Sequence, residues 1–201
     1  MNIILSTGCS SLNEIKEVLK KISFKKYKSK INLLHCISYY PAPIEYLNLK
    51  AISTLSSKTG LNVGFSDHSL SLLTGSFAVM QGANIIEKHI TLNRNYEGPD
   101  HRASLLPKEL FKYINLIREA EKSLGDGIKK IETIEKKVKK HMQKSLIVTN
   151  DCKKGKIIRN EDLSSMRPAK GLSVLKIDNI IGKRLIRNKI SGEYIHLNDF
   201  E

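Results

Sequence analysis

The chain has 201 residues, 40% of them hydrophobic, which is enough for one domain or two smaller ones with packed cores. Its formal net charge is +14, but 27 of its 34 basic residues are lysine and tryptophan is absent, so the arginine forks and stacking rings typical of nucleic-acid binding are scarce. No apolar run reaches the roughly 20 residues that span a membrane, no signal peptide is evident, and three widely spaced cysteines suit a reducing cytoplasm. We therefore expect a cytoplasmic protein with no nucleic-acid partner and no membrane insertion.

Short apolar segments alternate with helical patterns in the first 125 residues. Segments 3–6, 31–38, 63–67 and 85–89 are bounded by polar or turn residues, as buried parallel strands are. Helical spacing follows a possible capping box at Ser11 and Glu14, and it recurs over residues 70–80 and 107–124. This alternation predicts an α/β fold with a parallel sheet, either a barrel or a doubly wound sheet.

The pattern changes at a lysine-rich stretch, residues 129–144. Its apolar face is thin, which favours an exposed, partly helical linker over a helix lying on a membrane surface. Beyond it, segment 155–163 matches segment 192–200, with Gly, Ile, Asp and a closing apolar residue in register. The echo indicates a duplicated β-unit in a small C-terminal domain, which we expect to dock on another surface because of its size.

Polar side chains follow each predicted strand. Strand ends carry Ser6-Thr7-Gly8, His35-Cys36-Ile37-Ser38, Ser66-Asp67-His68 and Glu87-Lys88-His89. Because the carboxyl ends of neighbouring parallel strands share one edge of a sheet, we expect His68 and His89 to point at the same spot. Two imidazoles bind a divalent transition metal and leave positions open for oxygen ligands, while small hydroxyls suit an anion. A loop with Asp100, His101 and Arg102 follows, so an enzyme with a metal site is the leading interpretation.

Taken together, these motifs resemble one known family. Ser6-Thr7-Gly8, Leu34-His35-Cys36, Tyr40-Pro41-Ala42-Pro43, Gly64-Phe65-Ser66-Asp67-His68, Glu87-Lys88-His89 and Gly98-Pro99-Asp100-His101 stand in the order and spacing of the sialic acid (N-acetylneuraminate) synthase family. Residues 154–163 and Arg167-Pro168 are similar to that family's antifreeze-like (SAF) domain. The resemblance implies the C-terminal half of a (β/α)8 TIM barrel at residues 1–125, a basic linker at 126–143, and a mostly-β SAF (β-clip) domain at 144–201.

The resemblance also implies a reaction, that of a phosphoenolpyruvate-dependent transferase acting in surface polysaccharide biosynthesis. Such enzymes condense phosphoenolpyruvate with an N-acetylated amino-sugar, such as N-acetylmannosamine, and yield a nine-carbon 2-keto sugar acid and phosphate. A divalent metal, Mn²⁺ or Mg²⁺, polarises the sugar aldehyde in this family. Legionaminic and pseudaminic acid synthases are alternatives within it, and His35 and His101 favour the sialic or legionaminic branch over the pseudaminic one.

Residue roles in the family carry over to matching positions. His68 and His89 match metal ligands, while the positions that match phosphoenolpyruvate-binding residues are Ser6, Ser38 and Ser66. The positions that face the sugar are Tyr40, Glu87 and Asp100, of which Glu87 and Asp100 are the catalytic candidates. Arg167 matches an arginine that reaches the sugar's N-acetyl group in the partner subunit, which implies a domain-swapped homodimer.

The chain also departs from the family. The first four barrel strands, with their phosphate-binding lysines and an early glutamate, have no counterpart in the sequence, and a half-barrel would leave open strand edges and apolar faces. Three hypotheses follow. The chain complements a missing N-terminal half, or it pairs with a copy of itself and is active, or it is a non-catalytic carbohydrate-binding or interaction protein that uses its SAF domain.

Overall fold

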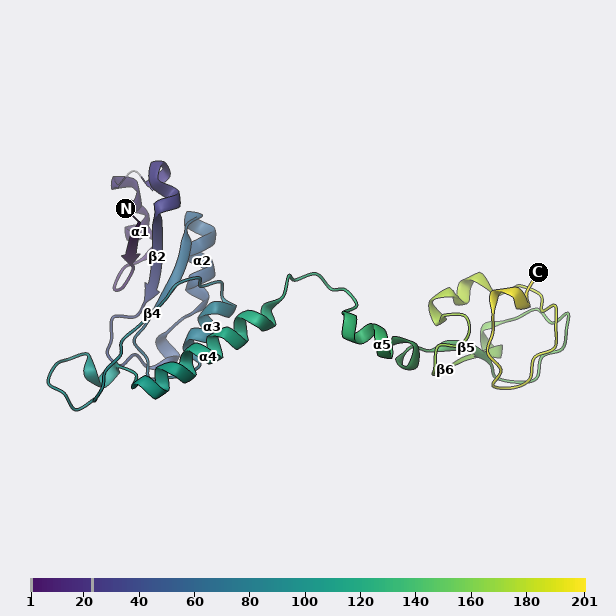
Figure 1. Ribbon diagram of the computed structural model, residues 1–201. Coiled ribbons are helices and arrows are strands. Elements are labelled where there is room, and N and C mark those ends of the chain that lie inside the picture. Colours follow the sequence, from purple (N-terminus) through teal and green to yellow (C-terminus); the bar gives the residue numbers. More distant parts are fainter. Residues whose placement is uncertain (1, 23) are drawn as a thin grey trace. The chain divides into compact units, whose positions relative to one another are not determined.

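The chain divides into two compact units, Met1–Ile128 and Lys129–Glu201. The computed structural model describes residues 2–22 and 24–201 (Figure 1). Among these residues no helix is both long and apolar enough to cross a membrane. Each unit has a hydrophobic core of its own.

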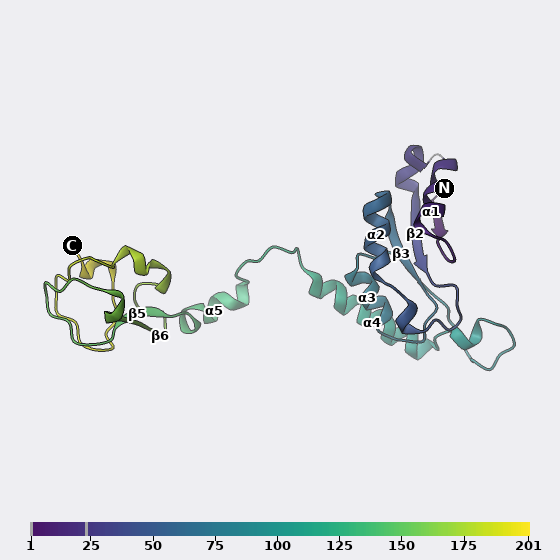
Figure 2. The ribbon, with the colours of Figure 1, turned by 180° about the vertical axis from the view of Figure 1, so that it is seen from behind.

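Unit 1 is built from four consecutive β–α repeats. Its strands are β1 (Ile3–Ser6), β2 (Ile31–Cys36), β3 (Asn62–Asp67) and β4 (Ile86–Lys88), and its helices are α1 (Leu12–Lys21), α2 (Lys50–Thr59), α3 (Thr74–Met80) and α4 (Pro107–Leu124). The strands pair in parallel in the order β1-β2-β3-β4. Both views of the ribbon place α2, α3 and α4 on the same side of this sheet (Figures 1 and 2). The predicted half-barrel with a parallel sheet is confirmed.

The core of unit 1 lies between the sheet and its helices. Leu33 on β2, Phe65 on β3 and Ile52 on α2 have no exposed surface, and they belong to the cluster that packs α1 and α2 on the sheet. A second cluster, around Leu105 and Tyr113, packs α4 against α3. Burying apolar surface in this way is the main favourable contribution to folding.

Local sequence signals set most helix ends. The capping box at Ser11 is present, because the Ser11 N–H donates to Glu14 Oε2 at 2.7 Å, and α1 follows it. Helix α4 begins at Pro107 and ends before Gly125, whose φ is +61°. The helix expected over residues 70–80 begins only at Thr74. The residues before it stay irregular because Asp67 Oδ1 accepts the Ser69 N–H at 2.8 Å, which competes with helical pairing.

Unit 2 holds a short helix and a small antiparallel sheet. Helix α5 (Thr133–Met142) occupies most of the expected linker, and all of its residues are exposed. Strands β5 (Ser145–Val148) and β6 (Leu163–Met166) pair antiparallel. The remaining chain coils around a buried aliphatic core that includes Ile158, Ile180 and Ile195.

The two echoing segments of unit 2 fold alike. Each carries a single 3₁₀ turn, Asn160–Asp162 in one and Leu197–Asp199 in the other. Their hydrogen bonds are reciprocal: Gly155 N–H donates to Leu185 O, and Gly192 N–H donates to Val148 O, both at 2.7–2.8 Å. The two donors are 37 residues apart and so are the two acceptors, in the opposite order, as expected for two copies that face each other across a pseudo-twofold axis.

Candidate active site

Strand alternation decides which side chains of β3 and β4 face the site. Successive side chains of a strand point to opposite faces, so Ser66 shares a face with His68, and Glu87 shares a face with His89. Ser66 and Glu87 are register partners on neighbouring strands. The Ser66 hydroxyl donates to Glu87 Oε1 at 2.5 Å, which ties the two strand ends together on the site face.

His68 is held in one tautomer. Its Nδ1 lies 2.7 Å from the carbonyl oxygen of Ile37, which can only accept, so the proton sits on Nδ1. The other ring nitrogen, Nε2, lies 3.2 Å from Ser66 Oγ. Because Ser66 gives its only hydrogen to Glu87, a neutral His68 keeps a bare Nε2 lone pair in a buried position.

His68 meets His89 and Tyr40 in a cluster of three rings. The centroids of the two imidazoles are 5.5 Å apart, with the ring planes at 67°. Tyr40 stacks on His68 at 4.0 Å and presents an edge to His89 at 5.8 Å. Asp100 completes the rim, with Oδ2 3.9 Å from His89 Nδ1. The structure thus gathers six of the predicted site residues: Tyr40, Ser66, His68, Glu87, His89 and Asp100.

The phenol of Tyr40 stays protonated in this setting. Partial burial of the ring raises the pKa of the Tyr40 hydroxyl, and the nearby carboxylates of Asp100 and Glu87 raise it further. A protonated phenol can donate a hydrogen bond to an oxygen of a bound molecule.

Ser6 and Ser38 lie after β1 and β2, beside Cys36. Ser6 Oγ is 3.5 Å from Cys36 Sγ. A Cβ added at Gly8 would collide with Ser38 Oγ and stand 2.9 Å from Cys36 Sγ, so a larger residue would require these side chains to move. Within the described chain, neither hydroxyl is hydrogen-bonded to the two imidazoles.

Two residues of the motifs point away from the site. His35 is buried, with Nε2 2.8 Å from Leu47 O and its ring stacked on Phe65. Lys88 lies between Glu87 and His89 in sequence but reaches the opposite face, where it pairs with Asp67. Burial lowers the pKa of the Lys88 ammonium, and the Asp67 carboxylate partly offsets this.

The sequence interpretation missed the buried contacts behind the site. Asp67 and Tyr113, joined by a 2.8 Å hydrogen bond, carried no assigned role. Strand alternation could have placed Asp67 opposite His68, but nothing local signals its contact with a helix residue 46 positions away. Arg167 lies in unit 2, where its Nε donates to Met142 O at 2.7 Å.

The two imidazoles fit a divalent metal as a partial set of ligands. Among the residues that the structure describes, no group of three or more His, Cys, Asp and Glu side chains is arranged to hold a metal. A cation held by His68 and His89 would therefore keep open positions for oxygen ligands from bound molecules. The bare Nε2 of His68 is the atom that best matches this role.

Comparison with known proteins identifies the family. The model of the NeuB family matches residues 1–129, and that of the SAF domain matches residues 143–201. The N,N'-diacetyllegionaminic acid synthase of Campylobacter jejuni is 43% identical over 96% of this chain and 58% of its own length. A pseudaminic acid synthase of the same species is 35% identical over 98% of this chain and 57% of its own length.

A solved structure supports the same family assignment. The crystal structure of the N-acetylneuraminic acid synthetase of Leptospira borgpetersenii aligns with a TM-score of 0.62 and 41% identity, over 68% of this chain and 47% of that one. The chain spans less than three fifths of the length of the two curated relatives. It belongs to the NeuB family of sialic-acid-type synthases and carries that family's SAF domain.

Proposed function

We propose that this chain carries the metal-binding half of a synthase that condenses phosphoenolpyruvate with an N-acetylated amino-sugar and releases phosphate. The product would be a nine-carbon 2-keto sugar acid for surface polysaccharide. The observation that carries the proposal is the convergence of His68 and His89 with Glu87 at neighbouring strand ends, in a chain of the NeuB family. The three free cysteines suit action in a reducing cytoplasm.

His68 and His89 would hold the metal, and Mn²⁺ suits them better than Mg²⁺. Imidazole nitrogen is a poor ligand for Mg²⁺, which prefers an octahedron of oxygens, whereas Mn²⁺, as a first-row transition ion, also accepts mixed nitrogen and oxygen ligands. When bound, such an ion would supply Lewis-acid polarisation of a carbonyl oxygen.

The remaining side chains would bind and orient the substrates. Tyr40, kept protonated, would donate to a sugar oxygen beside His68. Glu87 and Asp100 flank the imidazoles and are the groups placed to take or give protons. The hydroxyls of Ser6, Ser38 and Ser66 would bind the oxygens of phosphoenolpyruvate, since small hydroxyls suit an anion.

The charge of this site supports a need for residues from outside the chain. Phosphoenolpyruvate is a polyanion, yet the side chains that flank the imidazoles include two carboxylates, Glu87 and Asp100. Lys88, the nearest lysine in sequence, is committed to Asp67 on the other face. We propose that the first half of the barrel brings the missing positive charge by pairing with the edge strands β1 and β4.

Arg167 would complete the sugar site of a second subunit. It is exposed on unit 2, and its bond to Met142 O uses Nε and leaves both Nη nitrogens free to donate elsewhere. A planar guanidinium suits an amide or carboxylate oxygen. We propose that unit 2 lends this arginine to the barrel of its partner in a domain-swapped homodimer.

Sequence identity favours the legionaminic and sialic acid branches of the family over the pseudaminic branch. Identity is 43% with the diacetyllegionaminic acid synthase and 35% with the pseudaminic acid synthase, over nearly the same share of this chain. We therefore propose an N-acetylated amino-sugar that yields a legionaminic or sialic acid.

Phosphate release from phosphoenolpyruvate tests the proposal. The purified chain would be assayed with Mn²⁺ and N-acetylmannosamine or its 2,4-diacetamido analogue, alone and after mixing with the first four β–α repeats of the Campylobacter jejuni relative. We expect no turnover alone and sugar-dependent turnover in the mixture, lost when the chain carries His68→Ala and kept when it carries His141→Ala.

Other outcomes separate the alternatives. Turnover by the chain alone would mean that two copies complete the site for each other. Folded protein that binds Mn²⁺ but stays inactive in every mixture would refute the proposed catalysis. Sugar binding without Mn²⁺ dependence would favour the non-catalytic carbohydrate-binding role.

A further inference from the structure

A buried cluster of polar side chains lies directly behind the two histidines. Asp67 has no exposed surface, and its carboxylate takes hydrogen bonds from Ser69 N–H and Oγ on Oδ1, and from Thr74 Oγ1 and Tyr113 OH on Oδ2. Lys88 Nζ lies 3.2 Å from Oδ2 and also donates to Ser69 O. We call Asp67, Lys88 and Tyr113 the rear clamp.

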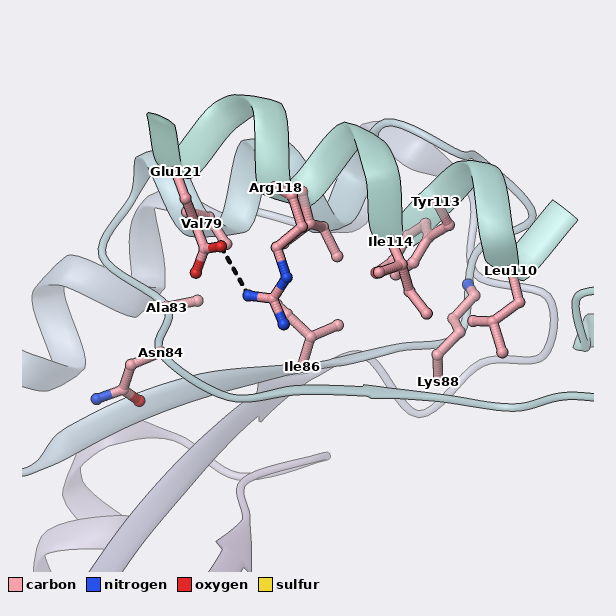
Figure 3. Close-up of a pocket in the computed structure, with 11 residues that line it drawn as sticks. Val79, Ala83, Asn84, Ile86, Lys88, Leu110, Tyr113, Ile114, Arg118 and Glu121 are labelled. Atoms are coloured by element: carbon pink, nitrogen blue, oxygen red, sulfur yellow. Dashed lines mark hydrogen bonds and ion pairs between the residues drawn. The ribbon is translucent and has the colours of Figure 1, made fainter. Parts of the chain in front are cut away.

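The rear clamp joins three elements. Asp67 ends β3, Lys88 ends β4 and Tyr113 comes from α4. Figure 3 shows Lys88 extending from β4 towards α4, at one end of the groove between this helix and the strand. Its Nζ is 5.5 Å from the centroid of the Tyr113 ring. A Cβ added at Gly75 would stand 2.5 Å from the Tyr113 hydroxyl, so α3 and α4 approach closely enough for Tyr113 to reach Asp67.

The rear clamp lies where the pairing of β3 with β4 ends. Asp67 and Lys88 are register partners and form the last pair of the β3–β4 ladder. His68 and His89 are the next residue on each strand, beyond the final ladder pair. After β4 ends, the chain at His89 pairs with Leu105 instead, whose N–H donates to His89 O at 3.0 Å. The clamp is therefore the last cross-link between β3 and β4 before the two imidazoles.

We propose that the rear clamp is a positioning device that sets the spacing of His68 and His89 for a divalent cation. This inference rests on the proposed metal site. Side chains next in the chain to a metal ligand move with its backbone, and partners that orient ligands commonly change metal affinity by about 10–100-fold when removed. The clamp acts through backbone position, so none of its members contacts the cation.

Tyr113→Phe is the sharpest test, because it removes one hydrogen bond to Asp67 and keeps the ring that packs α4. We expect its affinity for Mn²⁺, measured by electron paramagnetic resonance of the free ion in the full chain, to fall about tenfold. Lys88→Met would weaken binding further. Should Lys88→Met not fold, Tyr113→Phe decides alone.

A control of equal stability separates positioning from general loosening. Ile52 on α2 is fully buried in the other core cluster and touches no member of the clamp, so Ile52→Val or Ile52→Ala is chosen to match the Tm of Tyr113→Phe. Retained Mn²⁺ affinity in the control and reduced affinity in Tyr113→Phe support positioning. Equal affinity in Tyr113→Phe and wild type, or equal losses in variant and control, overturn it.

The two proposals fail in different ways. Wild-type protein that binds no Mn²⁺, or binds it as well after His68→Ala, would refute the metal site and the clamp's role with it. Wild-type binding that needs His68 but ignores Tyr113→Phe would refute the clamp alone.

Discussion

A backbone carbonyl sets the chemistry of His68. Because Ile37 O can only accept a hydrogen bond, the Nδ1 proton is fixed and Nε2 faces the site without one. A bound metal would use the Nε2 lone pair, beside Tyr40 and Ser66. A ring held in this way is already oriented for a ligand, so little rotamer entropy is lost on binding.

Loss of either imidazole should abolish Mn²⁺ binding. Removing a mere partner of a ligand costs about 10–100-fold in affinity, so His68→Ala and His89→Ala should each lose more than that. Titration of the full chain with Mn²⁺ by calorimetry measures the effect. His141→Ala, on exposed α5, is the matched control and should bind as wild type. Wild-type affinity in His68→Ala would exclude the site.

Acid should weaken unit 2 through Asp162. The hydrogen bond from Lys156 holds the pKa of the Asp162 carboxyl below its usual range, and the Arg159 N–H adds to this. A lowered folded-state pKa gives stability that is present above the unfolded value of about 3.9 and is lost as the pH falls through the folded value. Amide exchange of residues 145–200 in the full chain, measured from pH 7 downwards, should show protection falling below about pH 4.

Two variants check this assignment. Asp162→Asn keeps an oxygen for the Arg159 N–H but has no titratable charge, so the acid-dependent loss should shrink. Glu161→Gln, at an exposed neighbouring carboxylate, should leave the pH dependence unchanged. The same acid profile in Asp162→Asn and wild type would assign the effect to other groups.

The element scale shows where sequence patterns succeed. Strand β1 and helix α4 have the predicted bounds, because Pro107 and Gly125 punctuate the helix and polar residues flank the strand. Helix α2 escaped prediction: its Ser- and Thr-rich sequence has weak propensity and lacks a side-chain cap at Leu49. The predicted start of α3, residue 70, was wrong because Asp67, on the preceding strand, accepts hydrogen bonds from Ser69 and Thr74.

The same limit applies to the site. Strand alternation and parallel order were enough to bring His68 and His89 together, since both rules act over a few residues. The contact of Tyr113 with Asp67 depends on how α4 packs on α3, which no local pattern encodes. The proximity of the two histidines was thus predictable, and the buried contacts behind them were not.

The duplicated turns of unit 2 allow a controlled comparison of two aspartates. Asp162 and Asp199 both cap a turn, accepting the N–H of Arg159 and His196 at 3.0 and 2.8 Å. Only Asp199 also pairs with a buried lysine, Lys189, at 2.9 Å with side-chain exposures of 4% and 1%.

Asp199→Ala should therefore destabilise unit 2 more than Asp162→Ala. Removing one partner of a buried ion pair costs about 3–5 kcal/mol. Asp162→Ala loses a cap, which costs about 0.5–2 kcal/mol, and an ion pair with the partly exposed Lys156. Solvent-screened ion pairs of this kind add only about 0–1 kcal/mol. The urea dependence of amide exchange in the full chain gives the loss of unfolding free energy for each variant. The double variant Asp199→Leu with Lys189→Met should recover part of the loss; equal costs for the two alanine variants would contradict the duplicated-turn comparison.

At the scale of the whole molecule, unit 1 presents two unpaired strand edges. The order β1-β2-β3-β4 leaves β1 and β4 at the ends of the sheet, and a closed barrel would have no edges. On β1, the side chains of Ile3 and Ile4 are 40% and 55% exposed. Exposed apolar edge strands are templates for pairing with other chains, so we expect β1 to pair with a proposed barrel complement or with a second copy.

A charge on this edge should therefore block both kinds of pairing. We expect the wild-type chain to self-associate with rising concentration in sedimentation equilibrium, and Ile4→Lys to lower the association constant at least about tenfold, equal to ~1.4 kcal/mol. Ile134→Lys adds the same charge to an exposed position of a helix, α5, and should associate as wild type. A chain that stays monomeric at every concentration, or equal association in both variants, would show that β1 is not a pairing edge. If Ile4→Lys also loses phosphate release in the mixture with a first barrel half, while Ile134→Lys keeps it, then the β1 edge is used in both assemblies.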